Sequence, residues 1–411
     1  MMEEALKSKI AAFTHPLVPA NIREDLKDLE PLREALRGAR IVALGEGSHG
    51  TREHFLMKNR IIRFLVEEMG FHTFVIEASQ WQCYNINDYV IMGKGDKYEA
   101  LASQKFWTWD TQEVMEMIDW MRDYNLHCQR GQECRFLGFD MQIISDICPY
   151  LKALKPLMET QTAEKLVRFL EDVLAAKRGQ PAPDLESTAN WLSGWVQQNM
   201  QALKNRFGQR QTELFIEAAA TLQQYILMTV QKDGNEMRDL CMAENVARMV
   251  DGVDFSEKFI LWAHNGHIAH HFEWKNMGEL LKERYGSLYY AMGLALGRGS
   301  FQSRLFNRET KAVGALQAFE IPEFPEYVWE KDLSAVRPED YFLDLHKAAD
   351  DEQVSAWMSQ EKPFVMLDEA WDPEHGLKEY EYPMVLSKSY DGIIFTHHTS
   401  HAISNPSGKR G

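Results

Sequence analysis

Residues 39–81 read ARIVALGEGSHGTREHFLMKNRIIRFLVEEMGFHTFVIEASQW. An apolar run from Ile41 to Leu44 ends in a glycine-rich segment, and a second run from Phe74 to Ile76 ends in Glu77. Between the two runs, apolar residues recur with the 3.6-residue period of an amphipathic helix. The stretch therefore predicts a β-α-β unit, which is the building block of parallel sheets.

Three titratable residues, Glu46, His49 and Glu77, stand at the ends of the two predicted strands. In open α/β sheets, ligands bind outside the carboxyl ends of the strands, because loops and helix N-termini converge there. A single Glu or His at such a place can simply belong to a turn, but three together favour acid–base chemistry. A neutral histidine whose second ring nitrogen is held by a carboxylate is an effective general base near neutral pH. We therefore expect His49 to activate a water molecule.

Lys58 lies on the same helical arc as the apolar residues that follow His49. Its side chain can lean into the crevice, where a cation would help to stabilise the oxyanion formed when water adds to an ester carbonyl. It can equally run over apolar surface and reach water. The sequence leaves both alternatives open.

The composition limits the classes of function. A chain of 411 residues exceeds the usual size of one domain, and its net charge of −16 argues against nonspecific binding of nucleic acid or anionic membranes. Charged residues interrupt the amino-terminal sequence MMEEALKSKIAAF, so we expect a cytoplasmic protein without a membrane anchor. The five cysteines form no C-x-x-C pair and are expected to be reduced, mostly buried thiols.

Further apolar runs predict additional strands, and they are listed here: Arg135–Phe139, Phe259–Ala263, Leu288–Ala291, Pro363–Leu367 and Gly392–Phe395. Residues 150–230 have a helical pattern and no signal of chemistry. The fold class expected is α/β, with a central, mainly parallel sheet surrounded by helices and an inserted helical subdomain. We place the first part of the core at 1–150, the helical insertion at 151–235 and the second part of the core at 236–411.

Two of these strands also end in titratable residues. Asp140 follows one, and His264 and His267 follow the other, so all three are expected at the same edge of the sheet. Three aromatic residues near strand ends are candidates for binding a cyclic or apolar substrate, although such residues more often belong to the core: Tyr84, Trp107 and Trp109.

Two other charged segments carry a weaker signal. Arg238, Asp239 and Glu244 are interleaved with apolar residues, which is compatible with mutual pairing as well as with a role in the site. The three histidines of residues 396–401 are expected to be flexible and solvated, as terminal segments usually are.

The chemistry expected is water attack without a metal or other cofactor. The segment around Ser48 lacks the G-x-S-x-G arrangement of a nucleophilic serine. Imidazoles and carboxylates do suit zinc, iron or manganese, so a metal-dependent hydrolase of another substrate remains an alternative. However, the sequence contains no H-E-x-x-H motif, and we expect no bound metal.

The chain resembles the erythromycin esterase family over nearly its whole length. The blocks that carry the resemblance are GEGSHGTREHFLMKNRIIRFL, GFHTFVIEAS, RFLGFDMQ, RDLCMAENV and WAHNGHIAH, and their order and spacing together are specific. The resemblance implies an α/β core and an esterase that opens a cyclic ester, such as a macrolide lactone, or a related hydrophobic ester. Such an activity is the basis of macrolide antibiotic resistance.

Residue roles also follow from the resemblance. It assigns the general base to His49 and further catalytic positions to Glu46, Glu77 and His264, while His267 matches the second histidine of the H-N-x-H element. Where characterised members carry an arginine nine residues after the catalytic histidine, this chain has Lys58. A lysine keeps the charge but loses the fork that holds a carboxylate or carbonyl with two hydrogen bonds.

The resemblance also supplies an alternative of another class. The family is distantly similar to haem-binding lipoproteins, so a haem- or metal-binding module without turnover is the rival interpretation. The partner expected for the esterase is a small-molecule ester, with no nucleic acid and no membrane, acting on a monomer or homodimer.

Overall fold

The computed structural model describes residues 2–18 and 25–406, and among these residues ten strands form one sheet. The main path of the sheet runs β1-β8-β12-β6-β2-β5-β3-β4, with β7 and β10 also paired to β6. The strands are β1 Thr14–Pro16, β2 Ile41–Leu44, β3 Thr73–Ser79, β4 Arg135–Asp140, β5 Phe259–Trp262, β6 Tyr289–Asn307, β7 Ala312–Glu320, β8 Tyr341–Asp344, β10 Ala370–Trp371 and β12 Gly392–Thr399. A separate antiparallel pair consists of β9 Glu361–Val365 and β11 Glu381–Val385.

The six strands from β12 to β4 along this path are all parallel to one another. Antiparallel pairing occurs at β1, β8 and β7. Strands β2 and β5 are buried along their whole length, as expected for central parallel strands that are covered on both faces. The mainly parallel sheet predicted from the apolar runs is confirmed.

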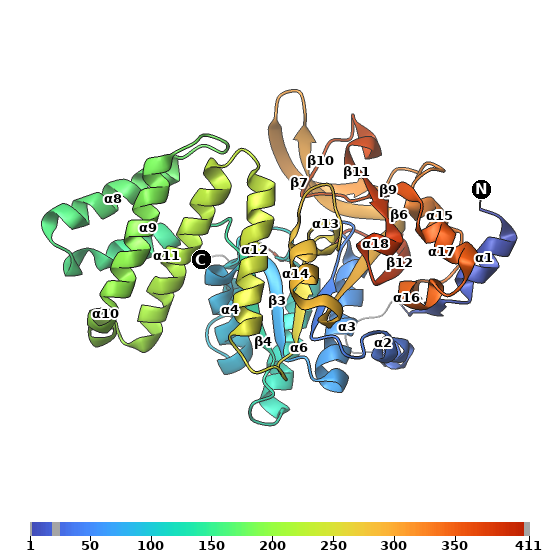
Figure 1. The fold of residues 1–411 in the computed structure, drawn as a ribbon, viewed down its shortest axis with the longest axis horizontal. Coiled ribbons are helices and arrows are strands. Elements are labelled where there is room, and N and C mark those ends of the chain that lie inside the picture. The colour runs from blue at the N-terminus through green and yellow to red at the C-terminus, as the bar shows by residue number, and fades with distance from the viewer. Residues whose placement is uncertain (1, 19–24, 407–411) are drawn as a thin grey trace.

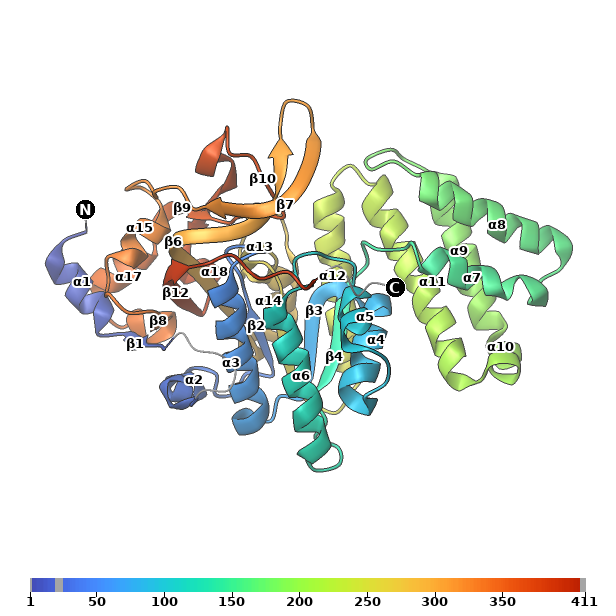
Figure 2. The ribbon, with the colours of Figure 1, turned by 180° about the vertical axis from the view of Figure 1, so that it is seen from behind.

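Helices cover both faces of the sheet (Figures 1 and 2). One face carries α3 Arg52–Met69, α4 Gln80–Met92 and α6 Gln112–His127, whose apolar side chains form one cluster with those of β2 and β3. The other carries α12 Gly234–Asp251, α14 Met277–Tyr285, α15 Trp329–Ser334 and α17 Glu352–Met358, which pack in a second cluster. The remaining helices outside the segment between β4 and β5 are α1 Glu4–Ala11, α2 Glu30–Ala35, α5 Lys97–Ala102, α13 Asn265–Ile268, α16 Leu345–Ala348 and α18 Leu386–Ser389.

A block of helices lies to one side of the sheet, at the left of Figure 1. It consists of α7 Ile147–Leu151, α8 Thr160–Ala175, α9 Pro183–Gln198, α10 Met200–Phe207 and α11 Gln209–Val230. These helices bury their own apolar cluster, which includes Leu170, Leu192 and Leu222. In sequence the block falls between β4 and β5, and the division of the chain at residues 151 and 235 stays a prediction.

Two segments differ from the sequence-based expectations. The histidine-rich segment expected to be flexible instead belongs to the sheet, because His398 and its neighbours pair with β6 through Arg298 and Gly299. The strand expected at Leu288–Ala291 starts at Tyr289 and runs on to Asn307, since its second half forms an antiparallel hairpin with β7. No helix within the described ranges is long and apolar enough to cross a membrane.

Candidate active site

Four adjacent parallel strands, in the order β2-β5-β3-β4, bring the titratable residues of the sequence motifs together. Glu46 and His49 follow β2, His264 and His267 follow β5, Glu77 lies near the end of β3 and Asp140 ends β4. Because neighbouring parallel strands end at the same edge, these six side chains form one row. The sequence-based prediction that they converge is therefore confirmed by the geometry.

The loop that carries Glu46 and His49 is packed too closely for larger residues. A Cβ atom at Gly45 would lie 2.1 Å from Oδ1 of Asn265, and one at Gly50 would lie 1.9 Å from the carbonyl oxygen of Gln302. Glycine is required here because neighbouring groups approach the loop closely, and not because of a positive φ. The loop is thus held in one position against β6.

Glu46 is fully buried and organises the first half of the site. Its Oε1 accepts a hydrogen bond of 2.8 Å from Nδ1 of His49, and its Oε2 accepts one of 2.7 Å from Nε1 of Trp262. Lys58, also fully buried, forms an ion pair with the same Oε2. We call Lys58, Glu46, His49 and Trp262 the base cluster.

The charges of the base cluster shift the pKa values of its members. Burial favours protonation of Glu46, but the Lys58 cation and the hydrogen bond from His49 outweigh it and lower the pKa of Glu46 to about 2. Burial lowers the pKa of Lys58 to about 8, because the attraction of Glu46 offsets only part of the desolvation. For His49, burial is outweighed by the hydrogen bond to Glu46 and by the charges of Glu46 and Glu77, so its pKa is raised. Glu46 is therefore an anion that holds a proton on Nδ1 of His49.

His264 lies beside His49, with their ring centroids 4.6 Å apart. Its backbone N–H donates a hydrogen bond of 2.9 Å to Oε2 of Glu77. Burial, with a further contribution from the nearby charge of His49, holds the pKa of His264 well below its ordinary value, so the imidazole stays neutral. Its Nε2 atom is buried and has no hydrogen-bond partner.

Arg238 of α12 organises the second half of the site. Its Nη2 donates hydrogen bonds of 2.6 Å to Glu77 and 2.8 Å to Asp140. Nδ1 of His267 lies 2.7 Å from Oδ1 of Asp239, and its Nε2 lies 3.3 Å from Oε1 of Glu77. We call these five residues the arginine cluster. Three carboxylates here surround two cations, and buried charges are tolerated only when paired in this way.

The pKa shifts within the arginine cluster keep its members ionised. Burial would raise the pKa of Glu77, but His267 and Arg238 outweigh it and hold that pKa well below the ordinary value. Burial likewise opposes the charge of His267, yet Asp239 and Glu77 raise its pKa to about 10. His267 is thus a cation near neutral pH and is unsuited to act as a base there.

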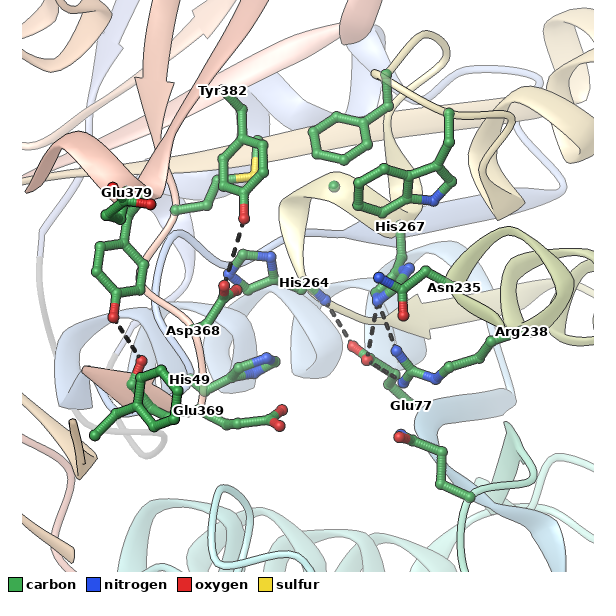
Figure 3. Close-up of a pocket in the computed structure, with 18 of the residues that line it drawn as sticks. His49, Glu77, Asn235, Arg238, His264, His267, Asp368, Glu369, Glu379 and Tyr382 are labelled. Atoms are coloured by element: carbon green, nitrogen blue, oxygen red, sulfur yellow. Dashed lines mark hydrogen bonds and ion pairs between the residues drawn. The ribbon is translucent and has the colours of Figure 1, made fainter. Parts of the chain in front are cut away.

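A cavity of about 510 Å³ opens between the two clusters (Figure 3). His49 and His264 line it, as do Glu77, Arg238 and His267 of the arginine cluster. Its other walls carry carboxylates that follow β9, aromatic side chains and residues of α12 and the surrounding loops, among them Asp368, Glu369, Phe272, Trp274, Tyr380, Tyr382, Asn235, Arg178 and Arg308. In Figure 3, Asp368 and Glu369 lie on the same side of the cavity as His49, and Arg238 lies on the other side.

Several residues predicted to bind substrate are not among those that line this cavity. Lys58 takes neither of the two courses expected for it, because it is buried against Glu46 and its Nζ lies 3.8 Å from the centroid of the Trp262 ring. Asp140 is occupied by Arg238. The substrate contacts predicted for these two residues stay predictions.

The three aromatic candidates occupy different surroundings. Trp109 is buried and packs edge-on against His49, at 6.4 Å between ring centroids. Tyr84 is half-buried, accepts a hydrogen bond from Gln80 and packs edge-on against Trp81, while Trp107 is half-buried. None of the three is among the residues that line the cavity, and their role in substrate binding stays a prediction.

Two groups of residues were missed by reasoning from the sequence. Arg238 and Asp239 were noted as a charged pair, but their partners come from distant strands, and no local pattern names those partners. Asp368 and Glu369 follow the predicted strand at Pro363–Leu367, so the strand-end rule would have singled them out. Within the described part of the chain, no three His, Cys, Asp or Glu side chains are grouped in an arrangement that could hold a metal ion.

Comparisons with known proteins agree on one family. The family model for erythromycin esterase matches residues 66–399. YbfO of Bacillus subtilis, a candidate hydrolase, is 24% identical over 96% of this chain and 91% of its own length. Erythromycin esterase type II of Escherichia coli is 25% identical over 85% of this chain and 90% of its own length. A solved structure of a Bacillus cereus protein superposes with a TM-score of 0.79 at 22% identity, over 98% of this chain and 99% of the other.

Proposed function

Because this chain belongs to the erythromycin esterase family, we propose that it is a hydrolase in which His49 activates water to break an ester bond. Family membership supports a hydrolase in general. The finer proposal is that the ester is cyclic, a macrolide lactone or a related hydrophobic ester, and that it is a small molecule held in the cavity described above. We also keep the expectation that the enzyme works in the cytoplasm.

The observation that carries this proposal is the hydrogen bond between His49 and Glu46. Glu46 is ionised and accepts from Nδ1, so Nδ1 carries the proton and Nε2 of the neutral imidazole is left with its lone pair. His49 lines the cavity, where Nε2 can take a proton from water as the water oxygen attacks the ester carbonyl. Lys58 contributes indirectly, because its cation keeps Glu46 ionised.

His264 is the group we propose to stabilise the oxyanion. A neutral imidazole can donate one N–H to the oxygen that becomes negative when water adds to the carbonyl. In support, Nε2 of His264 is buried and unpartnered beside His49, and Glu77 fixes the backbone of His264. Lys58 is unavailable for this role because Glu46 occupies it.

The cavity walls also bear on the substrate. Phe272, Trp274 and Tyr382 offer aromatic surface to an apolar ring, and aromatic rings contribute large buried areas in binding sites. The arginine cluster makes the opposite wall polar. A ring that carries both apolar and hydrogen-bonding groups fits these two walls.

The experiment is hydrolysis of a panel of macrolide lactones of different ring sizes, with mass spectrometry to detect the gain of one water. His49→Ala should lower turnover by about 10²–10⁴-fold, as loss of a general base does. His127→Ala, a change at an exposed position on α6, is the matched control and should retain the wild-type rate. Turnover that survives His49→Ala in a folded protein would exclude this mechanism, and loss of turnover after chelator treatment would favour a metal-dependent hydrolase.

A further inference from the structure

Asp368 is held at a fixed position relative to the loop that carries His49. Leu367 pairs with Ser48 in a parallel bridge, its N–H donates a hydrogen bond of 2.8 Å to the carbonyl of Gly47, and its carbonyl accepts one of 3.3 Å from the N–H of His49. Asp368 is the next residue along the chain, and it lines the same cavity as His49. The backbone therefore couples this carboxyl group directly to the candidate general base.

The carboxyl group of Asp368 lacks the cationic partners that other carboxylates of the site have. Glu46 is paired with Lys58, and Glu77 is paired with Arg238. Within residues 2–18 and 25–406, Asp368 forms no ion pair, and its one side-chain hydrogen bond is a long one of 3.4 Å from the hydroxyl of Tyr382 (Figure 3). A carboxyl group in such surroundings favours its protonated form.

The neighbouring charges act on Asp368 in the same direction as a whole. Burial raises the pKa of Asp368 to about 6, and the charge of Glu369 adds to this rise. The charges of His49 and His267 and the hydrogen bond from Tyr382 act in the opposite direction but are outweighed. The site therefore contains one carboxyl group that can carry a proton near neutral pH, beside Glu46 and Glu77, which do not. Two carboxyl groups whose environments separate their proton affinities are the usual arrangement for distinct acid and base roles.

We infer that Asp368 is the catalytic acid of this site and gives its proton to the oxygen of the leaving alcohol. This inference rests on the proposed function. The bond between the water oxygen and the ester carbon forms while Nε2 of His49 takes a proton from that water. As the tetrahedral intermediate collapses, the bond between carbon and the leaving oxygen breaks, and the proton of Asp368 moves to that oxygen. The proton held by His49 is then lost to solvent or returned to Asp368, so ester and water give acid and alcohol.

The test compares two esters of one acid, p-nitrophenyl butyrate and ethyl butyrate. A nitrophenolate leaves without being protonated near neutral pH, whereas an alkoxide is too basic to leave without a proton. Asp368→Asn should therefore lower kcat for the ethyl ester by about 10²–10⁴-fold and change that for the nitrophenyl ester by less than about tenfold. His49→Ala should lower both, because both esters need the activated water.

The outcomes separate the two proposals. If His49→Ala hydrolyses both esters at the wild-type rate, or if the wild-type enzyme hydrolyses neither, the proposed function fails. If His49→Ala loses both esters but Asp368→Asn loses both equally or neither, only the role of Asp368 is overturned. Asp368→Glu, which keeps the acid, should retain part of the ethyl ester activity, and the exposed change Asp350→Asn should alter neither rate.

A measurement without turnover completes the test. Aspartate labelled with ¹³C at the carboxyl carbon allows Asp368 to be titrated by NMR, with the Asp368→Asn variant identifying its resonance. We expect this resonance to titrate near pH 6. Titration of Asp368 at the ordinary pH of an aspartate, near 3.8, would overturn the inference even if an ester is hydrolysed.

Discussion

Nδ1 of His49 lies 2.8 Å from Oε1 of Glu46, three residues earlier in the same loop. The second oxygen of this carboxylate contacts Lys58 and Nε1 of Trp262, so Glu46 joins a buried cation to the imidazole that faces the cavity. The hydrogen bond and the negative charge both favour a proton on His49. Glu46 therefore decides which nitrogen of His49 is free and how basic it is.

The first prediction concerns this hydrogen bond. Glu46→Gln removes the charge that raises the pKa of His49, so that pKa should fall. Because activity requires the neutral imidazole, the acidic limb of the pH–rate profile should move to lower pH. The value of kcat should also fall by about tenfold to 100-fold, since a hydrogen bond to a charged group stabilises by about 1.5–3 kcal/mol. Glu116→Gln, at an exposed position of α6, should leave the profile unchanged. An acidic limb that stays in place or moves to higher pH would contradict the pairing.

Much of the site could be predicted from the sequence because it depends on one rule. Strands β2, β5, β3 and β4 are parallel neighbours, so polar residues at their carboxyl ends must meet at one edge. That rule places Glu46, Glu77 and His264 together without any knowledge of the loops. The apolar runs that define the strands are visible in the sequence because these strands are buried on both faces.

The rest of the site depends on packing that the sequence does not state. Arg238 reaches the site because α12 crosses the edge of the sheet, and a helical period cannot say over which strand ends a helix lies. Lys58 looked equally suited to the crevice and to water, and its burial follows from the single carboxylate of Glu46 below it. Asp368 follows β9, which pairs only with β11, so its distance from His49 depends on the bridge between Leu367 and Ser48.

The second prediction concerns the buried ion pair. Lys58→Met leaves the carboxylate of Glu46 buried without its cation, and breaking a buried pair in this way costs about 3–5 kcal/mol. The free energy of unfolding, measured by urea denaturation, should fall by about that amount. The pKa of His49 should rise further, because His49 becomes the remaining cation beside Glu46, so the acidic limb should move to higher pH.

The control for this change is Lys27→Met, which breaks an exposed ion pair with Asp25. Exposed pairs contribute about 0–1 kcal/mol, so this variant should unfold nearly as the wild-type protein does. Equal stability of the two variants would show that the pair with Glu46 does not stabilise the native state.

The third prediction is a pH dependence of stability that belongs to His267. The pKa of His267 is raised from 6.5 to about 10, because Asp239 and Glu77 outweigh burial. A histidine with a raised pKa in the folded state stabilises that state fully below pH 6.5, and this stabilisation is lost as the pH rises towards 10. The difference in free energy of unfolding between wild type and His267→Gln should therefore shrink across this range.

The measurement is urea denaturation at several pH values between about 6 and 10, with His127→Gln as the exposed control. Groups other than His267 also titrate in this range, but they are common to both proteins and cancel in the difference. A difference that stays constant with pH would mean that His267 is not held as a cation by its two carboxylates.

The last prediction tests whether the loop that carries His49 is held by close packing. At Gly50 an added Cβ would lie 1.9 Å from the carbonyl oxygen of Gln302, a backbone atom that cannot rotate away. Gly50→Ala should therefore destabilise the protein by about 1–3 kcal/mol and displace His49, so that kcat falls as well. Gly194, inside α9, has no atom within 4 Å of an added Cβ and no left-handed φ, so Gly194→Ala should stabilise by about 0.5–1 kcal/mol. Since both variants add one methyl group, opposite signs in urea denaturation would assign the effect to the contact with Gln302. A Gly50→Ala enzyme with wild-type stability and kcat would show that the loop can move away from β6 without affecting the base.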